Sequence, residues 1–232
     1  MPSGASGTRR SLVEAQILDA ATELFAARGY AGTSLQDVAS ATGLTRPALY
    51  HYFSSKEALL LRLVSEATVG PAGELREIGQ REGASATERL HDMAASVARL
   101  QARHPERFRM LIRSEADLPA EITETYDRGR REVLREFTTV IRAGVRSGEL
   151  RAVDPRIAAL GVIGLCNWVA WWHRPGDDEE DRRVVAALAE MAVASVAAAA
   201  TGDTATTGMA HAVDLLKRDV AALEVLLADQ AD

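Results

Sequence analysis

The stretch from Ala41 to Leu60, ATGLTRPALYHYFSSKEALL, most constrains how this chain can fold. A Thr42-Gly43 turn separates two short segments with helical apolar spacing, and Pro47 falls where the first turn of the second helix is expected. Two helices joined by a three-residue turn that contains glycine are typical of a helix-turn-helix. A purely structural αα-hairpin has the same outline, so the side chains on the second helix decide between the two.

The second helix carries an unusual set of exposed side chains. If Leu44, Leu49 and Phe53 point inward, aromatic, cationic and hydroxyl groups crowd the outside, and no acidic residue lies between Asp37 and Glu57. An exposed cluster of this kind is hard to explain by solubility. Hydroxyl and cationic groups contact DNA phosphates, and an arginine can donate two hydrogen bonds to guanine. The pattern therefore favours a DNA-binding helix.

Capping pairs predict where the surrounding helices begin. Each pair has a hydroxyl residue followed three positions later by Glu or Gln, just before an apolar run. The expected starts are Ser11 with Glu14, Thr33 with Gln36, and Ser54 with Glu57, and Thr45 opens the second helix of the motif.

The segment ILDAATELFAARGYAGTSLQDVASATGLTRPALYHYFSSKEALL resembles the DNA-binding domain of TetR-family transcriptional regulators. It matches the glycine before the aromatic residue, the Thr-Ser pair, the Ala-x-x-x-Gly-Leu turn and the Leu-Tyr-x-x-Phe-x-x-Lys-Glu-x-Leu ending. Tyr52 stands where many members have histidine, and it keeps a ring with a hydrogen-bond donor. The resemblance implies a homodimer that presents one recognition helix per subunit to double-stranded DNA. The residues expected at this DNA interface are Thr33, Ser34, Thr45, Arg46, Pro47, Ala48, Tyr50, His51, Tyr52 and Lys56.

Net charge does not oppose this interpretation. The whole chain carries −6, but residues 1–62 hold six Arg or Lys against five Asp or Glu, whereas residues 63–232 hold 21 against 28. The field near the recognition helix, rather than the sum over the chain, decides whether phosphates are attracted.

Other compartments and chemistries find little support. The single Cys166 forms no internal disulfide, the N-terminus lacks a secretory signal, and no apolar run reaches the about 20 residues that span a bilayer. His91, His104, His173 and His211 are widely separated, and no Gly-x-Ser-x-Gly elbow is present. We therefore expect a cytoplasmic protein that is not an enzyme and has no metal, cofactor or membrane partner.

The rest of the chain predicts more helices, so the expected fold class is all-α. Helices are expected over residues 87–103, from Pro105, from Pro119 to Gly148, from Pro155 to Pro175 and from residue 177, whereas residues 71–85 are expected to be a helix end and polar connection. The expected organisation is a flexible arm (1–9), a helix-turn-helix three-helix domain (10–55), a helical ligand-binding and dimerisation domain (56–201), and a linker with an extra amphipathic helix (202–232).

The helix after Pro155 is apolar nearly all round, so it requires burial by a core, a partner or both. In TetR-family proteins the equivalent pair of helices forms a four-helix bundle with its copy. Trp168, Trp171 and Trp172 lie on one face of this helix, either as core and dimer packing or as the wall of an apolar cavity. The residues expected around such a cavity are Met93, Phe108, Arg109, Met110, Tyr126, Arg130, Phe137, Trp168 and Trp172.

The stretch NWVAWWHRPGD is similar to the end of this helix in TetR-like regulators that respond to CoA thioesters. The resemblance implies a small-molecule effector, and acyl-CoA thioesters are the first candidates. The expected function is a ligand-released repressor on a pseudo-palindromic operator. The alternatives are an all-α enzyme or ligand carrier with a vestigial helix-turn-helix, and a protein-interaction scaffold.

The C-terminal tail has its own pattern. Apolar residues from Met209 to Leu227 recur at alternating steps of four and three, which gives a short heptad seam. This helix is expected either to dock on its own subunit or to pair across a dimer.

Overall fold

The computed structural model describes the backbone of residues 4–198 and the side chains of residues 10–198. In this range the chain forms helices and turns with one isolated antiparallel bridge, Leu150 to Ala197, which confirms the all-α fold. The expected tail seam lies outside the described residues. The α-helices are α1 Gly4–Arg28, α2 Leu35–Ala41, α3 Arg46–Tyr50, α4 Lys56–Ala67, α5 Val69–Gly79, α6 Ala86–Arg103, α7 Pro105–Ser114, α8 Ala120–Ser147, α9 Pro155–Trp172 and α10 Asp178–Ala194.

Several helix starts differ from those expected. Helix α1 begins at Gly4, so the expected capping pair at Ser11 is not its start, and residues 4–9 are helical rather than an arm. Ser34, not Thr33, caps α2, because its hydroxyl accepts from Asp37 N and the Asp37 carboxylate accepts from Ser34 N. The cap of α4 is likewise one residue later than expected, at Ser55. The sequence pattern located these helices and misplaced their first residues.

Helix α5 was expected to be a connection. Its Pro71 lies in the first turn, where a missing N–H breaks no intrahelical hydrogen bond. Ala72 and Leu75 are fully buried, and α5 packs against α6 and α8. The buried face stabilises this helix, although its Pro and Gly residues are typical of a connection in the sequence.

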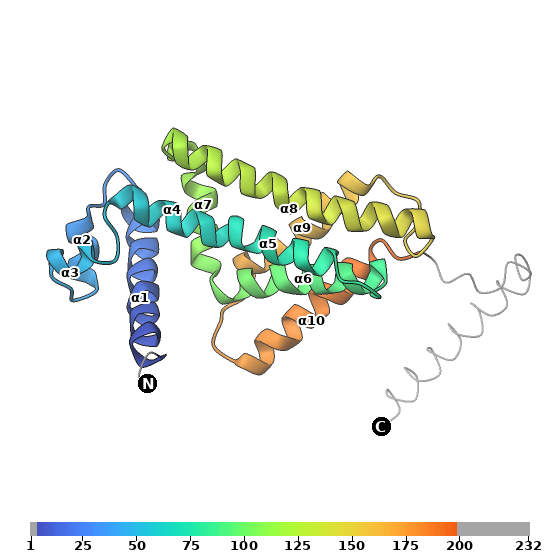
Figure 1. Ribbon diagram of the computed structural model, residues 1–232, viewed down its shortest axis with the longest axis horizontal. Helices are drawn as coiled ribbons and strands as arrows, with labels where there is room; N and C mark the ends of the chain where they lie inside the picture. The colour runs from blue at the N-terminus through green and yellow to red at the C-terminus, as the bar shows by residue number, and fades with distance from the viewer. Residues whose placement is uncertain (1–3, 199–232) are drawn as a thin grey trace, which may run out of the picture. The chain divides into compact units, whose positions relative to one another are not determined.

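The first three helices gather at one end of the described part of the chain, and α4 leads from them to the others (Figure 1). The long α8 lies along α5, and α6 contacts both α9 and α10 (Figure 1). The described residues up to Ala197 form one compact unit. The helix-turn-helix is thus joined to the remaining helices through packed contacts.

Two apolar clusters hold this unit together. The first includes fully buried Ile17, Val38 and Leu49, and also Met110 of α7 and Tyr126 of α8. The second is built from α5, α6, α8, α9 and α10. The core around the helix-turn-helix therefore continues past residue 55, where we expected a domain boundary.

Helix α9 is buried on one side only. Cys166 and Val169 are fully buried, and burial raises the pKa of the Cys166 thiol to about 12. Ile157 is 71% exposed and Trp168 is 63% exposed, and α10 adds Met191 at 55%. A single chain leaves this apolar face open, so the expected burial requires a partner.

Candidate functional site

The turn between α2 and α3 is held by local contacts. Gly43 has φ of +67°, a conformation that favours glycine, and Leu44 N donates to Ala39 O at 2.9 Å. Thr45 caps α3 by accepting from Ala48 N at 3.3 Å. Leu49 is fully buried and fixes the inner side of α3. The opposite side of this short helix therefore faces outward in a defined orientation.

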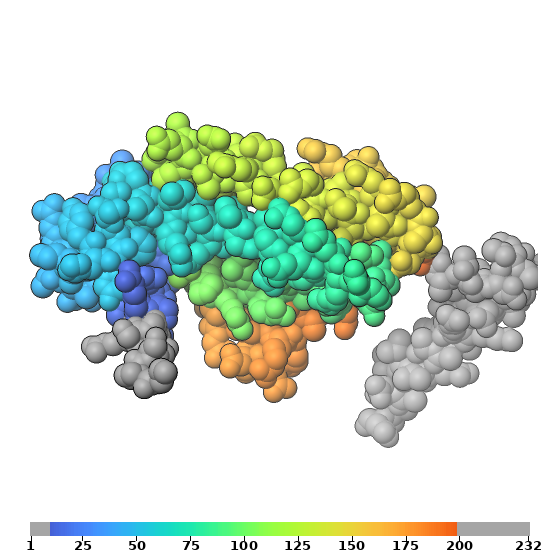
Figure 2. All heavy atoms as spheres, viewed as in Figure 1, coloured from blue at the N-terminus to red at the C-terminus, as the bar shows by residue number. Residues whose placement is uncertain are grey.

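The outward face carries most of the expected DNA contacts. Residues of α3 lie at the outer edge of the end formed by α1 to α3, and no other element covers them on the face shown in Figure 2. The Arg46 guanidinium carbon lies 5.6 Å from the Tyr50 ring centroid, and Arg46 Nη2 donates to Tyr50 Oη at 3.4 Å. Among the described residues, no carboxylate oxygen lies within 4.0 Å of the Arg46 guanidinium to neutralise it. The exposed residues are Ser34, Thr45, Arg46, Pro47, Tyr50 and His51, and Ala48 is partly exposed.

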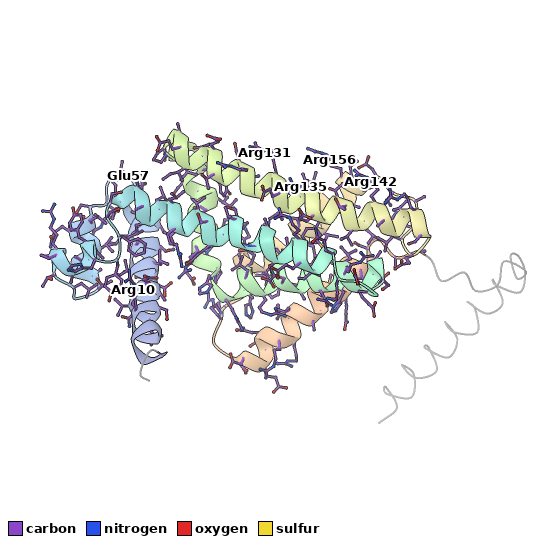
Figure 3. All side chains as sticks on the ribbon, viewed as in Figure 1. Arg10, Glu57, Arg131, Arg135, Arg142 and Arg156 are labelled. Atoms are coloured by element: carbon purple, nitrogen blue, oxygen red, sulfur yellow. The ribbon has the colours of Figure 1, made fainter. Side chains whose placement is uncertain are left out.

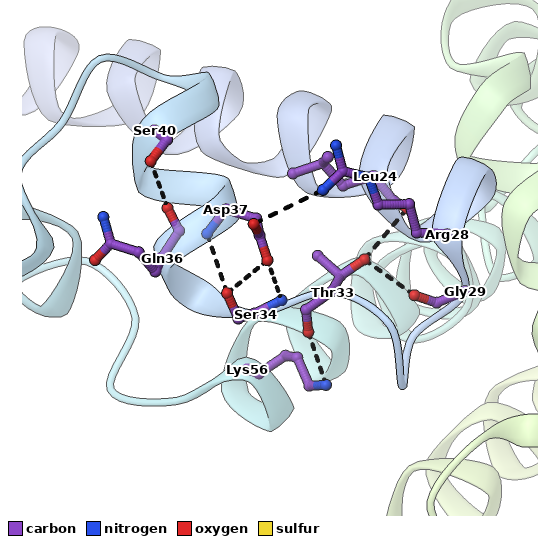
Figure 4. A network of polar contacts seen from close by, with 9 residues as sticks. All are labelled: Leu24, Arg28, Gly29, Thr33, Ser34, Gln36, Asp37, Ser40 and Lys56. Carbon is purple, nitrogen blue, oxygen red and sulfur yellow. Dashed lines mark hydrogen bonds and ion pairs between the residues drawn. The ribbon is translucent and has the colours of Figure 1, made fainter.

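Lys56 and Thr33 have structural partners instead of an open face. Lys56 Nζ donates to Thr33 O at 2.9 Å (Figure 4). It also donates to Tyr30 O at 2.8 Å and lies 4.2 Å from the Tyr30 ring centroid. Thr33 is 2% exposed, and its hydroxyl donates to Gly29 O. These contacts tie the end of α1 to the starts of α2 and α4, and contact of Lys56 or Thr33 with DNA stays a prediction.

Polar partners also surround the outer side of this unit. Tyr30 Oη donates to Glu57 Oε1 at 3.0 Å, and burial together with Glu57 raises the pKa of Tyr30 to about 12. Hydrogen bonds from Ser34 hold the pKa of the Asp37 carboxyl below its usual value. Tyr52 is partly buried, and the Arg10 guanidinium carbon lies 5.7 Å from its ring centroid. Sequence patterns gave no signal for this contact.

A hollow of about 460 Å³, here called the first hollow, opens among α4 to α9. Gln101 Nε2 donates to Asn167 Oδ1 at 3.2 Å on its wall. Burial raises the pKa of Tyr126, so its hydroxyl is a neutral hydrogen-bonding group. The wall consists of Ala67, Thr68, Pro71, Val97, Leu100, Gln101, Phe108, Leu111, Ile112, Tyr126, Asp127, Arg130, Arg131, Val133, Leu134, Arg156, Leu160, Ile163 and Asn167.

Cations line one part of this wall. Arg130 Nη1 pairs with Glu115 Oε1 at 2.7 Å. Arg131 and Arg156 line the same hollow, and among the described residues neither has an ion-pair partner within 4.0 Å. Figure 3 shows Arg131 and Arg135 on α8 and Arg156 at the start of α9. The arrangement suits a ligand with an apolar body and an anionic group.

Of the residues expected around the cavity, Phe108, Tyr126 and Arg130 line the first hollow. The other expected residues do not line this hollow, and their contact with an effector stays a prediction. Met93, Met110 and Phe137 are packed in the apolar clusters, because their helix faces point into the core rather than toward a void. Trp168 is largely exposed, and Arg109 and Trp172 border a separate hollow of about 280 Å³. Arg109 Nη1 donates there to Ala170 O at 2.6 Å.

Helix α7 connects the first hollow to the helix-turn-helix unit. Phe108 borders the hollow, and its neighbour Arg107 pairs with Asp19 of α1 and Glu66 of α4, both at 2.7 Å. The Arg107 side chain is 13% exposed, whereas the side chains of Asp19 and Glu66 are 58% and 32% exposed, so the guanidinium is shielded and its partners remain open to water. A shift of α7 therefore acts directly on α1 and α4.

No group of three or more His, Cys, Asp or Glu side chains there could hold a metal ion. None of the described helices has a stretch long and apolar enough to cross a membrane.

Two family models match the chain. The model for "Bacterial regulatory proteins, tetR family" matches residues 17–63, and the model for "Tetracyclin repressor-like, C-terminal domain" matches residues 83–196. The first match contains the α2-turn-α3 unit, and the second contains α7 and α8.

Whole-chain comparisons give the same picture. The HTH-type transcriptional repressor KstR2 of Rhodococcus jostii (strain RHA1) is 30% identical over 184 residues, which cover 75% of this chain and 83% of the relative. The TetR family transcriptional regulator PfmR from Thermus thermophilus has 29% identity and a TM-score of 0.65, covering 77% of this chain and 97% of that one. AibR in complex with isovaleryl coenzyme A and operator DNA has 24% identity and a TM-score of 0.58, covering 77% and 97%, a likeness of fold.

Proposed function

The chain belongs to the TetR family of DNA-binding transcriptional regulators, and we propose that it is a repressor. Binding of a small effector lowers the affinity of this repressor for its operator. The proposal assigns residues 10–55 to DNA binding and residues 56–201 to effector binding and dimerisation. The proposal assigns no catalytic step to the protein, and it places its action in the cytoplasm.

The exposed face of α3 carries this proposal. Within the described residues the Arg46 guanidinium contacts one side chain, Tyr50, so it remains able to donate two hydrogen bonds to a guanine. Pro47 and Ala48 are accessible to a thymine methyl group, and Thr45 lies at the helix N-terminus, where phosphates are favoured. These features support reading from the first turn of α3, with His51 contacting the backbone of the duplex.

The open apolar face of α9 and α10 supports a homodimer. Ile157, Leu160, Trp168 and Met191 are each at least half exposed there. A second copy that covered this face would remove the side chains from water. Two recognition helices would then meet successive major grooves, roughly 34–36 Å apart, and the operator would be pseudo-palindromic.

The first hollow supports an apolar, anionic effector. Its volume of about 460 Å³ is suited to a small molecule, and Arg131 and Arg156 can bind an anionic group. The AibR complex makes acyl-CoA thioesters reasonable first probes, although that likeness is one of fold. The effector must bind the DNA-released conformation more tightly than the DNA-bound one. Arg107 offers the route, because it links α7 to α1 and α4.

Selection of genomic fragments by the full-length protein, followed by fluorescence anisotropy on a selected duplex, tests the proposal. Specific binding should weaken steeply as salt rises, because each phosphate contact releases counterions. Isovaleryl-CoA, longer acyl-CoAs and planar cationic compounds are then added to the complex. An acyl-CoA should release the duplex.

Arg142→Ala is a matched control for Arg46→Ala, because Arg142 is an exposed arginine on α8, away from α3. Loss of specific binding should follow the change at Arg46 only. The absence of any specifically retained fragment at low salt would contradict the repressor function. Release by cationic compounds but not by acyl-CoAs would contradict the effector class.

A further inference from the structure

A second hollow lies against the first. Its volume is about 470 Å³, and its wall combines α4, α5, α6 and α7. The two hollows share five wall residues, which are Ala67, Pro71, Leu100, Gln101 and Phe108. The two spaces are of nearly equal volume and meet at these shared residues.

Two large apolar side chains of the shared wall are not fully packed into the core. Leu100 and Phe108 are partly exposed, although both are large apolar residues on helices that pack into the protein. Their remaining exposure faces the hollows that they border. A change of rotamer at Phe108 requires no movement of the α7 backbone. Leu100 and Phe108, two of the five residues between the hollows, can thus turn aside for a ligand.

The charges around the second hollow exclude it as a place for an anionic head. Arg107 on its wall is already paired with Glu66, and Glu66 also accepts from Arg62 Nε at 2.8 Å. Glu74 adds a carboxylate on the same wall. Arg131 and Arg156, in contrast, line only the first hollow. An anionic head therefore belongs at the first hollow, and an apolar group is the one suited to the second.

We propose that the second hollow extends the effector site and receives the far end of an acyl chain that is too long for the first hollow. The effector class is then a long-chain amphiphile with an anionic head at Arg131 and Arg156 and a chain that passes Phe108. This inference rests on the proposed function, because it assumes that the first hollow binds the effector. It adds selection by chain length, which the first hollow alone does not provide.

The extension places the end of a long chain beside Arg107. Arg107 lines the second hollow and joins α7 to Asp19 of α1 and Glu66 of α4. A chain that fills this space contacts the residue that holds the helix-turn-helix unit against α7. A short chain confined to the first hollow does not reach Arg107. Long chains should therefore release DNA more effectively than short ones at equal occupancy.

Two glycines of α5 provide a matched test. Gly70 lines the second hollow and not the first, and a Cβ there would meet only Ser65 O, at 3.8 Å. Gly73 lines neither hollow, and a Cβ there would meet nothing within 4 Å. Leucine at either position improves helix propensity. Gly70→Leu thus fills the second hollow, and Gly73→Leu repeats the chemical change outside it.

The experiment measures hexanoyl-CoA and palmitoyl-CoA binding to full-length wild type and variants by isothermal titration calorimetry, together with release of the selected duplex. In the wild type, affinity should rise about fourfold per methylene while the chain fills the site. Gly70→Leu should lower palmitoyl-CoA affinity at least about tenfold, since it displaces several methylenes, and leave hexanoyl-CoA affinity unchanged. Gly73→Leu should change neither. Gly70→Ala should give a smaller loss in the same direction.

The outcomes separate this inference from the proposed function. Unchanged palmitoyl-CoA affinity in Gly70→Leu, in a variant with the thermal midpoint of Gly73→Leu, overturns the extension and leaves the effector class in place. Equal losses for both thioesters also overturn it, because the second hollow would then not distinguish chain length. Failure of the wild type to bind either thioester overturns the extension and the acyl-CoA effector class, whereas the repressor function is tested separately by the selection of genomic fragments.

Discussion

Lys56 in the helix-turn-helix unit and two arginines in the region around the hollows differ in their hydrogen-bond and ion-pair partners. In the first region, Lys56 donates to two backbone carbonyls, at 2.8 and 2.9 Å, and these hydrogen bonds stabilise the fold. In the second, Arg131 and Arg156 border an open space, and within the described part of the chain neither has an ion-pair partner within 4.0 Å. The role of a cation here follows from its hydrogen-bond partners and cannot be taken from its position beside a motif.

Packing differs between the two regions in the same sense. The core under the helix-turn-helix contains Ile17, Val38 and Leu49, each of which is fully buried. This close packing holds α3 in one orientation. Around the hollows, Leu100 and Phe108 remain partly exposed. A filled core suits a surface that must keep a fixed geometry for DNA, whereas incomplete packing leaves room for a ligand.

The largest expected effect is a loss of stability in the helix-turn-helix unit. Lys56→Met leaves the carbonyls of Tyr30 and Thr33 without their charged donor, and each such hydrogen bond contributes about 1.5–3 kcal/mol. We expect the free energy of unfolding to fall by about 3 kcal/mol. Urea titration followed by circular dichroism measures this change, with Arg142→Met as the control at an exposed cation.

The same variant distinguishes a structural role from a phosphate contact. If Lys56 instead acts on DNA, Lys56→Met will keep its stability, weaken every duplex equally and reduce the salt slope by about one unit. That result would restore the role that the sequence motif predicts for Lys56. It would also remove the contrast between the two regions.

Arg46→Ala should act on binding and not on folding. Arg46 contacts only the exposed Tyr50 within the described part of the chain, so the free energy of unfolding should stay unchanged. Operator affinity should fall by about 1–3 kcal/mol, with relaxed preference at one base pair. Anisotropy on a set of singly substituted operator duplexes measures both. An equal loss for all duplexes would assign Arg46 to the phosphates.

Arg131→Gln and Arg156→Gln should act on the other region. Each removes a charged donor from the first hollow, so affinity for an anionic effector should fall by about 1–2 kcal/mol. Calorimetry with palmitoyl-CoA measures the loss, which should shrink as salt screens the charges. Arg146→Gln, at the exposed end of α8 and off the hollow wall, is the matched control. Equal losses in all three variants would indicate a diffuse charge effect instead of a binding site.

Local signals explain why the helix-turn-helix could be predicted from the sequence. The Thr42-Gly43 turn, the Thr45 cap and the inward Leu49 each act within a few residues, and all three have the expected roles. Helix α5 was missed because Pro71 and its glycines resemble a break, and only tertiary packing shows that they lie in a helix.

The hollow wall could be predicted only in part. Helical spacing groups Tyr126, Arg130 and Phe137 on related faces of α8, but it does not say which of them meets a void. Phe137 is fully buried in the core, whereas Arg130 borders the first hollow. Arg131 and Arg156 gave no sequence signal, because their shared space depends on how α8 and α9 pack.

His104 provides the smallest effect, at the junction between the two regions. It precedes α7 and lines the second hollow, next to Arg107. Burial and the charge of Arg107 lower the pKa of the His104 imidazole below its usual value, and the carboxylates of Asp19, Glu106 and Glu66 oppose this shift. The folded protein therefore favours the neutral ring.

This pKa shift predicts how stability depends on pH. Because the pKa of His104 is lower in the folded state than in the unfolded state, the folded state binds fewer protons. The contribution of neutral His104 to the free energy of unfolding is fully present at pH above the pKa of histidine in the unfolded state, about 6.5. This contribution is lost as the pH falls below that value. Urea titrations near neutral pH and at pH of about 5 should show a smaller acid loss in His104→Gln than in the wild type. His51→Gln, at the exposed end of α3, should behave as the wild type. Equal acid losses in all three proteins would assign this pH dependence to other groups and leave the junction insensitive to His104, because a group that does not change its protonation on unfolding contributes no slope.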